Sequence, residues 1–121
     1  MRQLLFVYGT LKRGLQNQHF LDEQKFVAEV KTLPHYRIYH FGWHPGMIEV
    51  SAQGLAVRGE IYEVDEQALS KMDEYEEVPT FFIRKPVLIL GFENVDAYYF
   101  NREIPAGTPF SDHWPFEIPK S

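Results

Sequence analysis

The chain has 121 residues, the size of one domain, because two units of half this length would each be too small to close a core. Its 12 Lys and Arg against 17 Asp and Glu give a net charge of −5, which disfavours binding to nucleic acid or to an anionic membrane. The lack of cysteine excludes a disulfide, a thiol nucleophile and a cysteine zinc site, and no apolar run reaches the length of a membrane span. We therefore expect a single cytoplasmic domain over residues 1–121.

Runs of apolar and β-favouring residues predict about six strands. They cover residues 4–8, 26–32, 36–41, 56–64, 81–90 and 95–100. The first run stops at Gly9, which predicts a sharp turn over residues 10–14. Apolar spacing over residues 15–23 predicts a short helix of two turns. Pro34 lacks the donor that a central strand needs, so we expect a hairpin or a bend there, and residues 42–46 read as a loop.

The second half contains the clearest helix. Asp65 is a good N-cap, and the acids after it suit the positive end of a helix over residues 66–76. Gly91 and Asn94 mark a turn between the last two strands. The proline-rich tail, residues 102–121, should pack on the domain or trail from it, and three aromatic residues could fix it: Phe110, Trp114 and Phe116. The expected fold class is α+β, with a small mixed sheet that is curved or barrel-like.

The turn after the first strand could bind an anion. Gly9 to Gly14 matches neither the P-loop nor the dinucleotide-binding pattern. A strand that stops at a glycine before a short helix can nevertheless present several backbone N–H groups in one concavity, which favours a carboxylate or an oxyanion. The alternative is an ordinary tight turn that leaves Lys12 and Arg13 in solvent.

Patterns for other catalytic chemistry are missing. His40 and His44 are four residues apart, which serves as a metal-ligand pair only on a helix, and Gly42 and Pro45 disfavour a helix there. No serine has the flanking glycines of a nucleophile elbow. We therefore expect no metal and no cofactor.

An acidic cluster at the end of the predicted helix contains a candidate general base. At about 100° per residue, one arc of about 120° should pack on the sheet; it contains Ala68, Leu69, Met72 and Tyr75. Glu76 falls inside this arc, whereas Glu74 and Glu77 point elsewhere and Asp73 lies at its border. Burial and the negative helix end would both raise the pKa of Glu76, which suits a general base. The alternative is that the helix ends by Tyr75 and the acids form a solvated loop.

Together these two segments resemble the γ-glutamylcyclotransferase-like (AIG2-like) family, in particular its short γ-glutamylamine cyclotransferase branch. Residues 7–14, Val-Tyr-Gly-Thr-Leu-Lys-Arg-Gly, resemble its amino-terminal signature. Residues 73–76, Asp-Glu-Tyr-Glu, followed by Pro79 and Arg84, resemble its second signature. Residues 59–64 and 42–46 are similar to its middle segments. The likeness covers roughly residues 5–100, and we find no counterpart for the tail after Asn101.

The resemblance implies an activity and a set of site residues. Glu76 would be the catalytic glutamate, and the substrate would bind to Tyr8, Gly9, Thr10 and Leu11. The reaction would be attack of the α-amine of a small γ-glutamyl compound on its own γ-carbonyl, which releases 5-oxoproline and a free amine. Phe82 departs from the family pattern, in which a tyrosine precedes the arginine by two residues. A non-catalytic binding module on the same fold is the alternative function, and a binder of single-stranded nucleic acid is a more distant one.

Overall fold

The computed structural model describes residues 2–42 and 44–117. Trp43 of the predicted loop and residues 118–121 of the predicted tail lie outside them. The strands are β1 (Arg2–Val7), β2 (Lys25–Lys31), β3 (Tyr36–His40), β4 (Pro45–Glu49), β5 (Arg58–Asp65), β6 (Phe82–Pro86), β7 (Val95–Phe100) and β8 (Phe110–Ser111). The helices are the short 3-10 helix η1 (Gln18–Leu21) and the α-helix α1 (Glu66–Tyr75).

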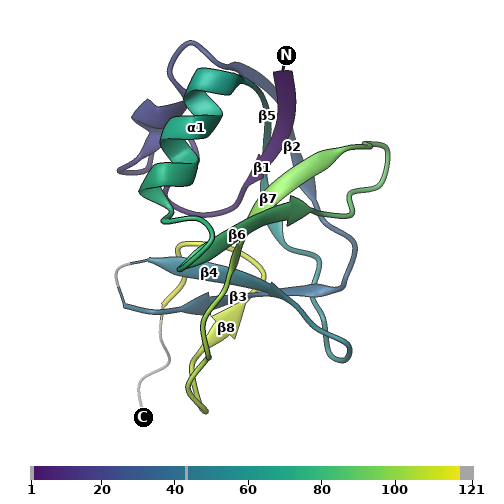
Figure 1. Cartoon of the computed structure of the whole chain (residues 1–121). Coiled ribbons are helices and arrows are strands. Elements are labelled where there is room, and N and C mark those ends of the chain that lie inside the picture. Colours follow the sequence, from purple (N-terminus) through teal and green to yellow (C-terminus); the bar gives the residue numbers. More distant parts are fainter. Residues whose placement is uncertain (1, 43, 118–121) are drawn as a thin grey trace.

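The strands form one mixed sheet in the order β2-β5-β1-β7-β4-β3-β8, with β6 paired to β7. β1 is central, antiparallel to β5 and parallel to β7, so the chain leaves the middle of the sheet at its first turn. The sheet curls into a half-barrel, with α1 beside β1 and β8 next to β3 at the far end (Figure 1). The expected α+β class with a curved mixed sheet is therefore confirmed.

The second half of the central strand, Leu5 to Val7, is buried because the sheet has a core on each side. Phe6 and Tyr8 pack with Tyr36, Ile38 and other residues inside the curl. The alternate residues of β1 pack on the opposite side, under α1; this second core includes Leu5, Val7, Ala68 and Met72. The end of β1 is thus held rigidly from two sides.

The main helix agrees with its prediction, and the Asp65 side chain caps it by accepting a hydrogen bond from the amide of Ala68 at 2.8 Å. Three other expectations are wrong. The predicted helix over residues 15–23 contains a single 3-10 turn, because only four residues adopt helical geometry. The segment predicted as a loop over residues 42–46 contains the start of β4, at Pro45. The strand predicted over residues 81–90 is shorter, because β6 runs only over Phe82–Pro86.

The two strands flanking Pro34 do not form a hairpin. β2 pairs with β5, and β3 pairs with β4 and β8, so the chain bends at Pro34 from one part of the sheet to another. The expected bend is therefore correct and the alternative hairpin is wrong.

The tail adds an edge strand to the sheet. β8 pairs with β3, with Phe110 opposite Tyr39. Trp114 is only 7% exposed and belongs to the core inside the curl. Within the described part of the chain, no helix is long and apolar enough to cross a membrane.

Candidate active site

A cavity of about 250 Å³ lies where β1 ends and α1 ends. All five residues that the sequence singled out for substrate binding and catalysis line it, although they come from segments more than 60 residues apart. The lining consists of Phe6, Val7, Tyr8, Gly9, Thr10, Leu11, His44, Pro45, Tyr75, Glu76, Glu77, Phe82 and Tyr98. The structure therefore brings the two predicted segments together, while the roles of their residues stay predictions.

The turn after β1 is buried along the cavity wall, since residues 8–11 are each less than a tenth exposed. It is closed by a hydrogen bond from the Lys12 amide to the Gly9 carbonyl at 3.1 Å. Among the described residues, no protein acceptor is recorded for the amide N–H of Gly9, Thr10 or Leu11. These three amides are therefore the candidate donors for an anionic group, as the sequence predicts.

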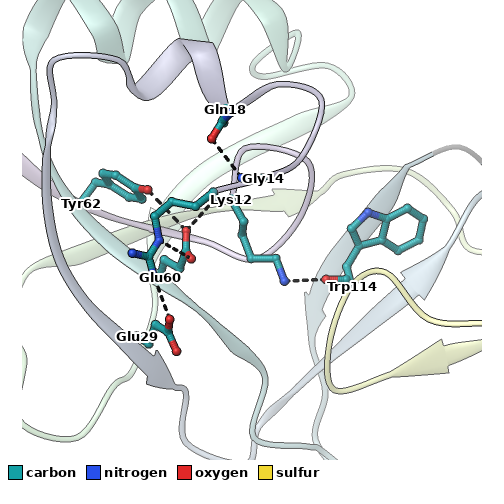
Figure 2. Close-up of polar contacts among 8 residues, drawn as sticks. Lys12, Gly14, Gln18, Glu29, Glu60, Tyr62 and Trp114 are labelled. Carbon is teal, nitrogen blue, oxygen red and sulfur yellow. Dashed lines mark hydrogen bonds and ion pairs between the residues drawn. The ribbon is translucent and has the colours of Figure 1, made fainter.

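Charged side chains brace this turn. The alternative of solvated Lys12 and Arg13 is wrong for Lys12, which is partly buried, and correct for the exposure of Arg13, although its guanidinium is ion-paired. Glu60 is 8% exposed and accepts hydrogen bonds from the backbone N–H and the Nε of Arg13 at 3.0 and 3.1 Å. Glu29 accepts from the same guanidinium at 2.7 Å. Figure 2 shows Glu60 within this cluster and Lys12 reaching the carbonyl oxygen of Trp114. Burial lowers the pKa of the Lys12 ammonium group.

Glu76 is the C-cap of α1, so the helix ends at Tyr75. The backbone N–H of Glu76 still makes a helical hydrogen bond. The Glu76 N–H donates to the Met72 carbonyl at 2.8 Å, the distance of a regular helical turn. This bond keeps Glu76 on the inward side that helical geometry predicts. Burial then raises the pKa of the Glu76 carboxyl from 4.5 to about 7. The alternative is therefore correct in ending the helix at Tyr75 and wrong in leaving Glu76 in a solvated loop.

Two neighbours of Glu76 differ from their predicted placement. Tyr75 was expected on the core face but is 41% exposed, and its ring lines the cavity instead. Glu77 was expected to point away, yet it also lines the cavity. The physical reason is that Glu77 has a φ of 53°, which takes it out of the helix and breaks the 100° spacing used for the prediction.

Two tyrosines line the cavity: Tyr8, which the sequence analysis named, and Tyr98, which it missed. The Tyr8 hydroxyl donates to the Tyr98 carbonyl at 2.7 Å and accepts from the Met47 amide at 3.1 Å. The Tyr98 hydroxyl donates to the Asp73 carboxylate at 2.6 Å. Burial is the main cause that raises the pKa of both phenols, so both remain neutral at physiological pH. Both hydroxyls are fixed by the protein.

Asp73 and Arg84, which belong to the second signature, form an ion-pair network beside the cavity. The Arg84 guanidinium contacts Asp73 through two nitrogens, at 3.0 and 3.2 Å, and Asp96 at 2.9 Å. Asp73 in turn holds Tyr98. Neither Asp73 nor Arg84 lines the cavity, so the network supports its wall and ties α1 to β6 and β7.

The remaining walls include Pro45 and Phe82, which the sequence analysis noted but did not assign to the site. Pro45, at the start of β4, packs so closely on the turn that a Cβ added to Gly9 would lie 2.6 Å from its Cγ. Phe82 is 7% exposed and lines the cavity, next to Phe100 at 5.6 Å between ring centroids. Because Phe82 lines the cavity, its wall lacks here the hydroxyl that the tyrosine of the family pattern would supply. The pairing of β4 and β6 with β7 brings these two residues to the cavity.

Comparison with known proteins places this geometry in context. The family described as gamma-glutamyl cyclotransferase, AIG2-like, matches residues 5–115, so the match continues into the tail for which no counterpart was expected. A Vibrio cholerae protein is 37% identical over 87 residues, which span 72% of this chain and 73% of that protein. The human gamma-glutamylaminecyclotransferase is 38% identical over 88 residues, 67% of this chain and 58% of the human protein, so the chain spans less than two thirds of that relative.

A solved structure has the same fold. The crystal structure of an AIG2-like protein from Mus musculus superimposes with a TM-score of 0.81 and 30% sequence identity. The superposition covers 98% of this chain and 91% of the mouse chain. The likeness therefore extends over nearly the whole fold.

Proposed function

Because the chain belongs to the gamma-glutamyl cyclotransferase, AIG2-like family, we propose that it converts a small γ-glutamyl compound into 5-oxoproline and a free amine. The substrate would be a γ-glutamylamine or a γ-glutamyl amino acid. The observation that carries the proposal is the placement of one enclosed carboxyl, Glu76, in the same cavity as the amide donors of residues 9–11.

The reaction needs one group that accepts and then returns a proton. The α-amine of the substrate attacks its own γ-carbonyl carbon, a new C–N bond closes a five-membered ring, and the original amide C–N bond breaks. Glu76 would take the proton from the attacking nitrogen and deliver it to the leaving nitrogen. A pKa of about 7 suits both transfers, since the carboxyl can be present in either form near neutral pH.

The other contribution is the shape that the cavity imposes. Since the nucleophile and the electrophile belong to one molecule, holding the folded conformer can supply roughly 7 to 11 kcal/mol of the barrier in favourable cases. The amide donors of residues 9–11 would bind the substrate carboxylate or the developing oxyanion. A cavity of about 250 Å³ suits a small substrate, because drug-sized ligands occupy roughly 300 to 1,000 Å³.

The proposal is tested by incubating the protein with a panel of γ-glutamyl amines and γ-glutamyl amino acids and measuring 5-oxoproline. We expect turnover of at least one compound, with a kcat/KM that rises with pH through about 7 as Glu76 loses its proton. Binding of these compounds without any 5-oxoproline would instead support a non-catalytic binding module. The panel also identifies the preferred leaving amine.

A further inference from the structure

Asn17 connects the two segments that carry the candidate site. It lies between the turn after β1 and the 3-10 helix η1. Its backbone N–H donates to the Thr10 carbonyl at 2.9 Å. Its side-chain amide donates to the Thr10 hydroxyl and to the Tyr75 hydroxyl, both at 2.8 Å. One side chain therefore bridges the substrate-binding turn and the end of α1.

Both partners of Asn17 lie on the cavity, and one of them directly precedes the proposed base. Thr10 is 8% exposed and belongs to the turn that carries the candidate amide donors. Tyr75 is 41% exposed, so the protein covers this wall only thinly. Its ring contacts Phe20, with 4.8 Å between the ring centroids, and its hydroxyl is held by Asn17.

We propose that Asn17 is a positioning residue, which fixes the distance between the Thr10 turn and the Tyr75 wall and so keeps Glu76 enclosed in the cavity that the turn lines. This inference rests on the proposed function. Intramolecular cyclisation depends on a tightly defined substrate conformer, and a displacement of about 1 Å in a site can cost roughly 100-fold in rate. Asn17 would thus act on the rate through its two neighbours, without contact with the reacting atoms.

The bridge also has an effect on the protonation of Glu76. Because the pKa of Glu76 is raised by burial, a loosened Tyr75 wall would admit water and lower that pKa toward 4.5. Other titratable residues also line the cavity and contribute to its field: Tyr8, His44, Tyr75, Glu77 and Tyr98. They are the same in the variants below, apart from the Tyr75 hydroxyl. A shift in the Glu76 pKa would therefore indicate that the Tyr75 wall has loosened.

The experiment compares Asn17→Ala and Tyr75→Phe with the wild type, using γ-glutamylmethylamide and γ-glutamylalanine as probes. We expect kcat to fall roughly 10- to 100-fold in Asn17→Ala, and the pH midpoint of kcat/KM to move down by at least about half a unit. Tyr75→Phe keeps the ring on Phe20 and should reproduce the pH shift. The double variant should lose little more than Asn17→Ala alone, because both substitutions break one bridge.

Gln18→Ala is the matched control. The Gln18 side chain accepts a hydrogen bond from the Gly14 amide at 3.0 Å, so it also braces this turn, but it does not line the cavity. We expect wild-type kcat and pH midpoint for this variant. Equal effects of Gln18→Ala and Asn17→Ala would overturn the proposal, because they would reduce Asn17 to general support of the turn.

Nuclear magnetic resonance titration of the Glu76 carboxyl measures the same shift without any substrate. A lower Glu76 pKa in Asn17→Ala and Tyr75→Phe supports the positioning role, and an unchanged pKa in both variants refutes it. If the wild type releases no 5-oxoproline while the titration shows the shift, the proposed function fails and the positioning of Glu76 stands.

Discussion

The enclosed Glu76 carboxyl should make the protein less stable as the pH rises, and Glu76→Gln should remove this loss. An acid whose pKa rises from 4.5 in the unfolded chain to about 7 in the folded protein binds its proton more tightly when folded. Its contribution to stability is therefore fully present below pH 4.5 and is lost as the pH increases through 7. A rise of this size corresponds to about 3 kcal/mol.

Urea denaturation of both proteins between pH 4 and pH 8 measures this difference. The free energy of unfolding of Glu76→Gln should gain about 3 kcal/mol relative to the wild type across this range. With a slope of roughly 1 to 3 kcal/mol per M urea, the relative midpoint moves by about 1 to 3 M. The side chain of Glu77 is exposed, so Glu77→Gln should keep the pH dependence of the wild type. Parallel pH curves for Glu76→Gln and the wild type would refute the burial argument.

Three further substitutions test the walls of the cavity. Arg84→Met removes the partner shared by the Asp73 and Asp96 carboxylates, so the free energy of unfolding should fall. The loss should be about 2 kcal/mol, less than for a fully buried pair, because these groups are only partly buried. An unchanged urea midpoint would contradict this. Phe82→Tyr adds a hydroxyl at the cavity, so the relative kcat/KM values across the γ-glutamyl panel should change at equal stability, and identical profiles would place this ring outside the substrate's reach. Gly9→Ala would place its Cβ against Pro45, so calorimetry should show weaker binding of 5-oxoproline; unchanged affinity would argue against a tight turn.

The sequence was sufficient for the elements with strong local signals. The Asp65 cap and the apolar spacing after it define α1 within one residue of its observed end. The run of residues 4–8 that stops at Gly9 locates the central strand and the turn. β4 was missed because Pro45 and Gly46 are typical loop residues, and their pairing with β3 and β7 depends on tertiary structure.

The sequence likewise predicted only those parts of the candidate site that depend on local structure. Helical geometry indicated that Glu76 faces inward, and the structure agrees because its amide still bonds Met72. The same geometry misplaced Glu77, since the chain leaves the helix between these two residues. Phe82 and Tyr98 reach the cavity only through the pairing of β6 with β7 and of β7 with β1, which local patterns do not determine.

The turnover of Glu76→Gln, measured beside Glu77→Gln as 5-oxoproline released per enzyme, tests the proposed mechanism most directly. The two substitutions are chemically identical, lie at adjacent positions and both alter the cavity. If Glu76 is the general base, Glu76→Gln should lower kcat roughly 100- to 10,000-fold with little change in substrate affinity. Glu77→Gln should cost no more than about 10-fold, the scale of a changed surface charge near a site. A kcat of Glu76→Gln close to that of the wild type, or a larger loss in Glu77→Gln, would contradict the mechanism.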